Sequence, residues 1–439
     1  MRQIPVTRSD PALVCGGRFP WIARPGIWFW ALCGIGLLAR LFLASATRGT
    51  TDAELWTRHA EGVATYGLTG HSQRDVLFNH PPLIAIAMAK LWMVAQDWHV
   101  EFRVLYRSLF VLADVVNIWL LVRVLAGQPW RFLAAGLYAI APVAVVLAAM
   151  HGNTDALVAT CLLLTCLAVG AKRPVLAGVC IGLGAWIKLP ALFAAPAFGF
   201  AFPRWRDRVW CALAATLIAA ATYVPAFAEN PELLWNRIFG YRGMLIQTSA
   251  DPLIWIWGFK TWFVRLYGGN MMEWPVWAIW FRDNSHWVSL PLMFVFGFLR
   301  RRENDAHSLA VTAAGSYAIF YAFSETWTFQ YFAWSMPFWF VAGRSFGWAA
   351  NLFGGGYIYF LYAFLCQDWL LRPEWGFSLH APWPLWLILL RDCAHTAFAW
   401  FSLAFLARAV IVEWRATQWR NGGAASPPGP RLSSDSGAD

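Results

Sequence analysis

Long apolar runs, separated by short polar or basic stretches, follow one another along almost the whole chain. A helix that crosses a bilayer needs about 20 apolar residues, and most of these runs are near that length. Short loops rich in Lys and Arg stay in the cytoplasm, so the basic stretches fix the direction of each run. The pattern therefore predicts an all-α fold, a polytopic transmembrane bundle of about 12 helices with every basic cluster on one side.

The first run, 27–46, follows a basic N-terminus, and its length favours an uncleaved first helix over a removed signal peptide. An apolar hairpin broken at Lys188-Leu189-Pro190 is predicted as two short helices, because basic clusters flank it on both sides. The apolar stretch from Leu83 to Val94 is too short to span comfortably. The expected crossings are 27–46, 103–126, 131–149, 156–171, 175–187, 190–202, 209–227, 286–299, 306–323, 330–343, 346–366 and 384–409.

Two long hydrophilic segments fall on the same, non-cytoplasmic face in this topology. They cover 47–102 and 228–285, and their amphipathic pieces predict interfacial helices. Loops that a rigid scaffold positions often carry function, so we expect any chemistry on this face. The expected organisation is a cytoplasmic basic N-terminus (1–26), a transmembrane module containing both loops (27–345), C-terminal transmembrane helices (346–412) and a cytoplasmic, disordered tail (413–439).

The composition agrees with an integral membrane protein and excludes several other classes of protein. Only 13% of the residues are charged, against about 25% in a globular domain, which excludes a surface exposed to water on every side. The apolar stretches lie along the whole chain and leave no room for a large soluble domain. The net charge of +10 comes from Arg residues between apolar runs, and no nucleic-acid motif accompanies them, so no nucleic-acid partner is expected. The 8 Cys include no Cys-x-x-Cys pair and are interpreted as core residues rather than as disulfides or a zinc site. The 30 Trp and 33 Phe fit both headgroup anchors and walls that stack on sugars.

Asp52 stands at the start of the first outer segment, directly after the first crossing, and therefore at the membrane boundary. Two interpretations are open on the residues alone. Asp52 or Thr51 can cap a short interfacial helix that runs to about Tyr66. Alternatively, Asp52 is a general base at the lipid–water interface, where a carboxylate can take a proton from an attacking hydroxyl.

Other polar residues inside or beside apolar runs also have two interpretations. Lys188 is either a cation that holds a phosphate or a lysine that extends from a helix end to the interface. Asp155 is either a second functional carboxylate or the N-cap of the helix that follows it. Asp114 and Asn117, one turn apart in a predicted crossing, are interpreted as polar packing that faces the bundle rather than as part of a pathway through it.

His80 and His151 are candidates to hydrogen-bond sugar hydroxyls or phosphate. Together with Asp52 and Asp155 they also raise the question of a metal. No Asp-x-Asp pair and no close His spacing supports such a site, so neither a metal nor a cofactor is expected.

Several short motifs occur in a fixed order along 27–345. They are Asp52-Ala53-Glu54, Tyr66-Gly67, Pro81-Pro82-Leu83, Gly152-Asn153-Thr154-Asp155-Ala156, Trp186-Ile187-Lys188-Leu189-Pro190 and Gln330-Tyr331-Phe332-Ala333-Trp334-Ser335-Met336-Pro337. In order and predicted sidedness this set resembles the GT-C superfamily of membrane glycosyltransferases. The likeness is nearest to members that use polyprenyl-phosphate mannose or glucose. The sequence departs from that pattern at Ala53, where an aromatic is usual, and at His80, where an aromatic or acidic residue is usual.

The resemblance implies a catalytic GT-C-like module with Asp52 as the base and Glu54 as its helper or a sugar ligand. It implies inversion at the anomeric carbon, since the base lies opposite the leaving phosphate. Candidates to bind the donor phosphate or sugar are Lys188, His80, His151, Asp155, Arg242, Tyr241, Gln330 and Tyr331. Arg237 and Arg265, in the second outer segment, are further cations of this kind.

The implied partners are a polyprenyl-phosphate sugar, membrane lipid, and an acceptor that is a lipid, a glycan or a protein. The composition favours a bacterial inner membrane over the endoplasmic reticulum. The main alternative is a secondary transporter, which also has broken helices and sparse buried charge. No internal repeat is visible, however, and the polar residues gather in two loops on one face. A non-catalytic membrane subunit that presents aromatic loops is a third class.

Overall fold

The computed structural model of this chain is almost wholly helical, and it describes residues 25–238, 256–257, 262–263, 266–267, 273–324, 327–373 and 384–421. The helices up to residue 201 are α2 (Ile27–Ala46), α3 (Thr51–Arg74), α4 (Pro82–Asp97), α5 (Phe102–Val124), α6 (Arg131–Ala139), α7 (Pro142–Val146), the π-helical turn η2 (Leu147–His151), α8 (Asp155–Gly170), α9 (Pro174–Ile187), the 3-10 turn η3 (Leu189–Ala194) and α10 (Ala195–Ala201). The later helices are α11 (Trp205–Glu229), α12 (Pro231–Ile238), α15 (Val276–Asn284), α16 (His286–Leu299), α17 (Ala306–Phe323), η5 (Phe329–Tyr331), α18 (Phe332–Ala342), α19 (Arg344–Ala350), η6 (Asn351–Gly355), α20 (Gly356–Cys366) and α21 (Leu385–Asn421). The described strands, β1 (Ile256–Trp257) and β2 (Trp327–Thr328), form one short antiparallel pair.

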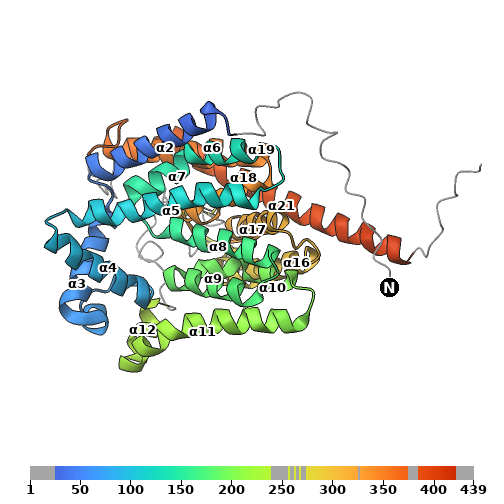
Figure 1. The fold of residues 1–439 in the computed structure, drawn as a ribbon, viewed down its shortest axis with the longest axis horizontal. Coiled ribbons are helices and arrows are strands. Elements are labelled where there is room, and N and C mark those ends of the chain that lie inside the picture. Colours follow the sequence, from blue (N-terminus) through green and yellow to red (C-terminus); the bar gives the residue numbers. More distant parts are fainter. Residues whose placement is uncertain are drawn as a thin grey trace, which may run out of the picture.

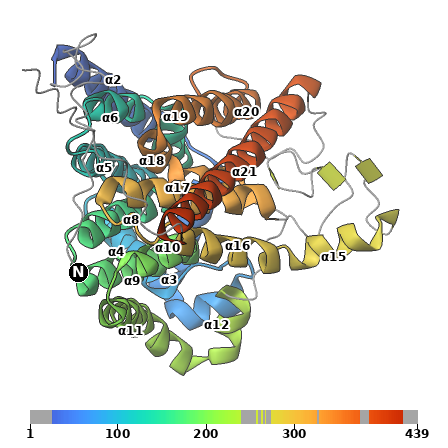
Figure 2. The same cartoon turned by 90° about the vertical axis from the view of Figure 1, so that its right-hand side faces the viewer.

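The helices lie side by side with their axes roughly along one direction (Figure 1). In that view α2, α6 and α5 lie above α8 and α9, and α11 covers the opposite side. Helices α3, α4 and α12 gather at one end of the bundle, and α21 extends beyond the other end. Figure 2 shows α21 passing diagonally over α17, while α15 lies away from the bundle. The apolar core is built mainly by α8, α17, α18 and α20.

Among the described residues, five helical stretches are long and apolar enough to cross a membrane: Ile27–Ala46, Phe102–Val124, Trp205–Glu229, Phe346–Cys366 and Leu385–Ala416. Helix α6 and the continuous segment α7–η2 meet at an angle of 45°, and together they would form a sixth membrane span over 131–151. Several central helices of the described chain are apolar but only 10–17 residues long. The all-helical, membrane-spanning fold is therefore confirmed, whereas the count of about 12 crossings is not, because breaks shorten these helices below about 20 residues.

The last helix differs from the prediction. Residues 413–421, expected in a disordered tail, belong to α21, which runs on to Asn421. No glycine or proline interrupts the chain between 385 and 421, and Gly422-Gly423 is the first glycine pair beyond it. Helix-forming residues continue to Asn421, so the prediction of a disordered tail is wrong for those nine positions.

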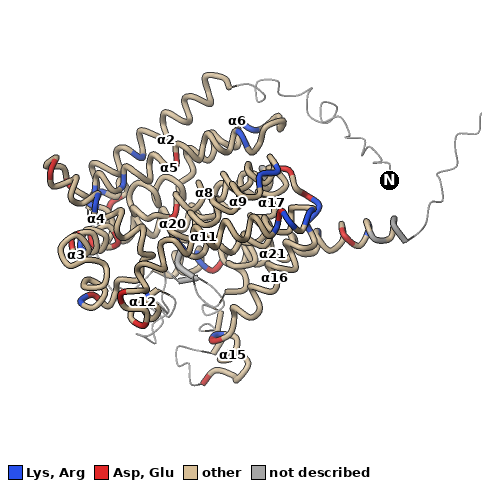
Figure 3. Tube along the Cα trace, turned by 60° about the horizontal axis from the view of Figure 1, so that its bottom comes forward, with Lys and Arg blue, Asp and Glu red and all other residues tan. Residues whose placement is uncertain are grey.

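The two ends of the bundle differ in the sign of the charges they carry. Lys and Arg dominate the end where α16 turns into α17, whereas the α3, α4 and α12 end carries both signs (Figure 3). In the sequence, basic residues flank the turn α5–α6 and lie within the turns α8–α9, α10–α11 and α16–α17. This is the distribution that a positive-inside orientation requires.

A buried ion pair ties α2 to α5. The Arg40 guanidinium donates to Asp114 Oδ2 at 2.9 and 3.1 Å, and the two side chains are 1% and 3% exposed. Tyr138 donates its hydroxyl to the other oxygen of Asp114, and Asn117 donates to the carbonyl of Ala156 at 3.1 Å. Asp114 and Asn117 therefore join α2, α5, α6 and α8, in agreement with the prediction that they are polar packing.

Replacing Asp114 by Ala is expected to destabilise the protein, because it leaves the Arg40 charge buried without its carboxylate. Breaking a buried ion pair from one side typically costs about 3–5 kcal/mol. The measurement is the thermal unfolding midpoint of the detergent-solubilised protein, with Asp97→Ala at the exposed end of α4 as the control. The double variant Arg40→Met with Asp114→Leu should recover most of the loss. Equal midpoints for Asp114→Ala and Asp97→Ala would contradict a structural role for the pair.

Candidate active site

The segment His151–Asp155 joins η2 to α8 and brings two polar clusters together. Gly152 makes this turn possible, because its φ is +67°, a left-handed conformation that side chains rarely adopt. A Cβ at Gly152 would also lie 2.7 Å from Cγ of Arg107. The π-helical turn η2 widens the helix directly before His151. Such turns are frequent at functional sites.

The first cluster is a chain of three side chains. His151 Nε2 lies 2.7 Å from Asp52 Oδ2, and His151 Nδ1 contacts the hydroxyl of Tyr362 on α20. With a proton on Nε2 the imidazole donates to Asp52, while Nδ1 shares a hydrogen bond with the Tyr362 hydroxyl. His151 is 1% exposed, whereas the Asp52 side chain is 32% exposed. The buried His151 thus orients the Asp52 carboxylate, which remains accessible to a substrate.

The electrostatics keep Asp52 ionised. Burial raises the pKa of the Asp52 carboxyl, but the contact with His151 and the positive charge of Lys188 together outweigh burial and hold the pKa below its usual value. A general base has to be deprotonated before it can accept a proton. Asp52 meets that condition at neutral pH.

Arg107 on α5 fixes the chain just before Asp52. Its guanidinium donates to the Thr47 carbonyl at 2.7 Å and to the Thr47 hydroxyl at 3.0 Å, and the whole side chain is buried. Its Nε donates to the Arg103 carbonyl at 3.1 Å. Arg107 therefore ties the end of α2 to α5, and in doing so it sets where α3 and its Asp52 begin.

The second cluster surrounds Lys188, at the break between α9 and η3. Its Nζ lies 2.7 Å from Asp155 Oδ1 and 3.4 Å from Asn153 Oδ1. The same Oδ1 of Asp155 accepts a hydrogen bond from the indole of Trp334. The ring of Tyr331 stacks on Trp334 at 4.1 Å, and Lys188 lies 5.5 Å from the Tyr331 ring and 5.6 Å from the Trp334 ring. An aromatic wall and a carboxylate thus hold the ammonium group.

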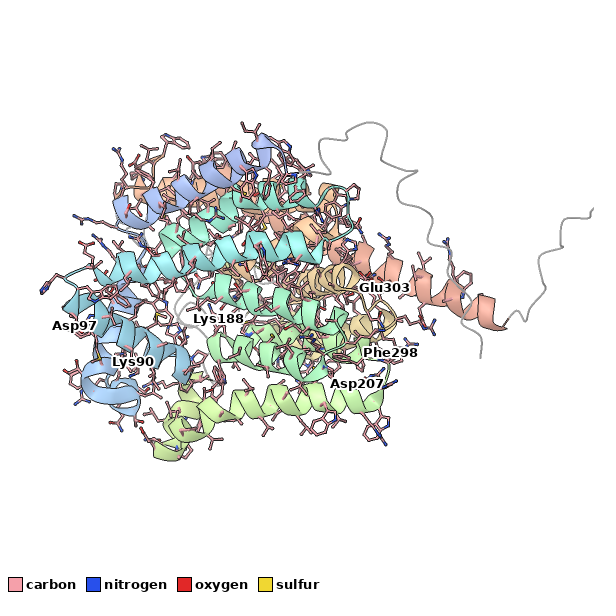
Figure 4. All side chains as sticks on the ribbon, in the orientation of Figure 1. Lys90, Asp97, Lys188, Asp207, Phe298 and Glu303 are labelled. Atoms are coloured by element: carbon pink, nitrogen blue, oxygen red, sulfur yellow. The ribbon has the colours of Figure 1, made fainter. Side chains whose placement is uncertain are left out.

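Lys188 keeps access to its surroundings. Its side chain is 19% exposed, whereas Asp155 is 1% exposed. Asp155 Oδ2 is buried, and it has no hydrogen-bond partner among the residues that the structure describes. Figure 4 places Lys188 in the half of the bundle nearer Lys90 and Asp97, away from Asp207, Phe298 and Glu303 at the basic end. The ammonium group therefore belongs to the same half as Asp52 on α3.

His80 contributes a ring rather than a charge. It stacks on Trp56 of α3 with the ring centroids 3.9 Å apart. Burial lowers the pKa of His80 well below its usual range, as do the charges of His59 and Lys188, and Asp52 offsets this only in part. His80 is therefore neutral at physiological pH and available for hydrogen bonds. Trp56, which is 2% exposed, holds it beside the helix that carries Asp52.

The structure brings together five of the predicted residues: Asp52, His151, Asp155, Lys188 and Tyr331. His80 joins them through Trp56, and Gln330 precedes Tyr331 in η5. Glu54 is exposed and lies two positions from Asp52 on α3, a spacing at which helix side chains point in different directions. Arg237 donates to the Val76 carbonyl at 3.3 Å, at the turn between α3 and α4. Tyr241, Arg242 and Arg265 lie outside the described residues.

Two contributors were not predicted. In the sequence, Arg107 is one of many arginines and lies near the start of a predicted crossing. Tyr362 lies in an apolar, aromatic stretch that contains no motif. Trp334 was part of the late motif but had no assigned role. Contacts between residues more than 200 positions apart, such as Tyr362 with His151, have no local signal in one sequence.

The model of glycosyltransferase family 87 matches residues 78–324, more than half of the chain. The match contains His80, Arg107, His151, Asp155 and Lys188. Asp52 precedes it, and Tyr362 follows it. No curated protein matches this sequence.

Proposed function

The chain belongs to glycosyltransferase family 87, a GT-C-like family of membrane glycosyltransferases, and from that premise we propose the reaction. It is the inverting transfer of a mannose- or glucose-type hexose from a polyprenyl phosphate to an acceptor hydroxyl. Membership makes the protein an enzyme with a sugar donor and an acceptor, which removes the transporter and the non-catalytic subunit as alternatives. The single observation that carries the proposal is the pair of clusters, Asp52–His151 and Lys188–Asp155, at the two ends of one five-residue turn.

In the proposed reaction the acceptor hydroxyl approaches Asp52. The carboxylate takes the proton while the hydroxyl oxygen forms a bond to the anomeric carbon. On the other side of that carbon the bond to the phosphate oxygen breaks, and polyprenyl phosphate leaves with the electron pair. Attack opposite the leaving group inverts the anomeric configuration. His151 and Tyr362 hold the Asp52 carboxylate in one orientation throughout.

Lys188 fits the leaving phosphate. Negative charge on the phosphate grows as the bond breaks, and a fixed cation in a partly buried site stabilises that charge. Asp155 and the two aromatic rings fix the ammonium group, so little reorganisation is needed when the donor binds. The rings of Tyr331 and Trp334 also offer faces on which a hexose can stack.

An apolar groove continues from this position and fits the isoprenoid chain. It begins at Leu189, the neighbour of Lys188, and passes between α10, α11 and α16 with a volume of about 730 Å³. Its lining is apolar apart from Arg208, and the exposed side chains of Leu192 and Phe294 put it at the surface of the bundle. A polyprenyl tail lying there would bring its phosphate to Lys188. The membrane would then supply the donor directly.

We place the reaction on the non-cytoplasmic face. The Asp52 end carries α3, α4 and α12, and the basic turns gather at the other end (Figure 3). If the basic end faces the cytoplasm, as the positive-inside rule expects, Asp52 faces away from it. Polyprenyl-linked sugars, rather than nucleotide sugars, are the donors suited to that side, and a bacterial inner membrane is the proposed location.

The donor class is testable with the purified protein in lipid nanodiscs. We expect transfer from radiolabelled polyprenyl-phosphate mannose or glucose and none from the corresponding nucleotide sugars. A Cβ at Gly199, in the groove, meets nothing within 4 Å, so Gly199→Leu adds apolar atoms where the groove is open. It should raise the KM for long-chain donors several-fold and change the KM for short-chain analogues much less. Transfer from nucleotide sugars alone would overturn the proposal.

Gly34→Leu on α2 is the matched control, because a Cβ at Gly34 also meets nothing within 4 Å and Gly34 lies outside the groove. It should leave the KM for both donors unchanged. If Gly199→Leu behaves like Gly34→Leu while wild-type transfer persists, the groove holds membrane lipid rather than the donor tail. The assignment of the tail would then be wrong, and the assignment of the donor class would stand.

A further inference from the structure

His59, His71 and Asp75 converge at the α3 end of the bundle, apart from the clusters described above. His59 Nδ1 lies 3.0 Å from His71 Nε2 and 3.5 Å from Asp75 Oδ2. One ligand atom from each of the three residues lies within 4.8 Å of the others. Both histidines are buried, at 2% and 4% exposure, and the Asp75 side chain is 13% exposed. Three donors that metals prefer thus face one small volume.

The backbone of α3 is bent in a way that brings these donors together. In a straight helix, residues 12 positions apart are separated by about 18 Å along the axis. The chain breaks the helix at Gly67, whose φ of +71° and ψ of 172° are far from helical, and the second half folds back on the first. Gly62 makes room for this return, because a Cβ there would lie 2.2 Å from His71 Nδ1. Two glycines are therefore placed where the approach of His71 to His59 requires them.

The distances fit a tetrahedral zinc site. With Zn–N and Zn–O bonds of about 2.0–2.1 Å, neighbouring ligand atoms lie about 3.3 Å apart. The contacts of His59 with His71 and Asp75, at 3.0 and 3.5 Å, fall on either side of that value, and the ligand atoms of His71 and Asp75 lie within 4.8 Å of each other. Two imidazoles and one carboxylate form a ligand set typical of zinc, with one position left for water.

The carboxylate is already oriented by outer contacts. The Asp75 Oδ1 accepts the backbone N–H of Leu77 at 2.9 Å, and the Arg58 guanidinium contacts Oδ2 at 2.9 and 3.0 Å. Such outer hydrogen bonds orient the first ligands in known metal sites. The rings of Phe78 and His80 pack against His59, at 5.2 and 5.6 Å, and limit access of solvent.

We propose that His59, His71 and Asp75 bind one Zn²⁺ ion that clamps the two halves of α3 together. The ion would fix the fold-back at Gly67, and with it Trp56, His80 and the helix that begins beside Asp52. This structural role is independent of the sugar donor and of the transfer reaction. The sequence spacing of twelve and four residues matches no metal motif, which is why only the folded chain suggests the site.

The test is the metal content of the full chain, purified through a tag without histidines. After incubation with Zn²⁺ and removal of the excess, mass spectrometry should find about one Zn²⁺ per wild-type chain and less than a tenth of that in His71→Gln. His99→Ala, an exposed histidine at the end of α4, is the matched control and should retain the wild-type amount. Wild-type protein without Zn²⁺, or His71→Gln with the wild-type amount, would overturn the proposal.

A second measurement uses the wild-type protein alone, and it tests metal binding even if His71→Gln fails to fold. Co²⁺ exchanged into the wild-type protein should give the intense visible d–d absorption of a four-coordinate site with nitrogen ligands. Added Zn²⁺ should remove that absorption and raise the unfolding temperature by a few degrees, since an ion that binds only the folded state stabilises it. Absence of the absorption at saturating Co²⁺ would show that the three side chains form a hydrogen-bonded cluster and no metal site.

Discussion

Replacing Asp52 by Asn is expected to lower the rate of sugar transfer by about 10²- to 10⁴-fold, the usual contribution of a general base. The amide has the shape of the carboxylate and can still accept the hydrogen bond from His151 Nε2, so the fold of the site should persist. What is lost is the group that takes the proton from the acceptor hydroxyl. The measurement is kcat at saturating donor in nanodiscs, with the KM for the donor expected to change little.

Two further variants separate proton transfer from general damage to α3. Glu61→Gln neutralises an exposed carboxylate of the same helix and should leave kcat at the wild-type level. Tyr362→Phe removes the outer hydrogen bond to His151, so its loss should be about tenfold at most, since one such bond contributes about 0.5–1.5 kcal/mol. Wild-type transfer by Asp52→Asn would show that another group is the base. A loss in Glu61→Gln as large as in Asp52→Asn would mean that α3 tolerates no change of charge.

The positions of many helices could be predicted because local signals end them. The expected crossings 286–299 and 306–323 coincide with α16 and α17. Between them lie three arginines, and Asp305 caps α17 by accepting the N–H of Ser308 at 3.1 Å. The apolar run 131–149 has no such stop, yet it bends by 45° at Pro142. Proline removes a helix hydrogen bond, so hydropathy alone overestimates the length of this helix.

The candidate site was predictable where a polar residue interrupts an apolar run. Asp155 and Lys188 stand out in this way, because an isolated charge at membrane depth is costly and needs a partner. The structure supplies that partner, since each pairs with the other at 2.7 Å. The pairing itself could not be foreseen from residues 33 positions apart. The same holds for His59 with His71, whose contact depends on the positive φ of Gly67 and on packing around Gly62.

Replacing Lys188 by Met is expected to reduce kcat/KM for the donor by about 10²- to 10³-fold, the range for loss of one preorganised group that stabilises developing charge. Methionine keeps most of the length of the side chain and its contacts with Tyr331 and Trp334, so the aromatic wall should remain. The phosphate would lose the cation that stabilises it as the bond to the sugar breaks. Lys188→Arg keeps the charge and should recover part of the activity, because a guanidinium also binds phosphate but is bulkier between the two rings.

Because Lys188 pairs with Asp155, a loss of activity in Lys188→Met can come from a loss of stability, so the unfolding temperature must be measured as well. Without the ammonium group, Asp155 is a buried carboxylate whose Oδ1 keeps only the Trp334 indole, and the protein should be less stable. The double variant Lys188→Met with Asp155→Asn removes that buried charge and should regain most of the unfolding temperature. If Lys188 acts on the phosphate, the double variant stays as inactive as the single one. Recovery of activity together with stability would mean that Lys188 only neutralises Asp155, and the phosphate would then have to bind elsewhere.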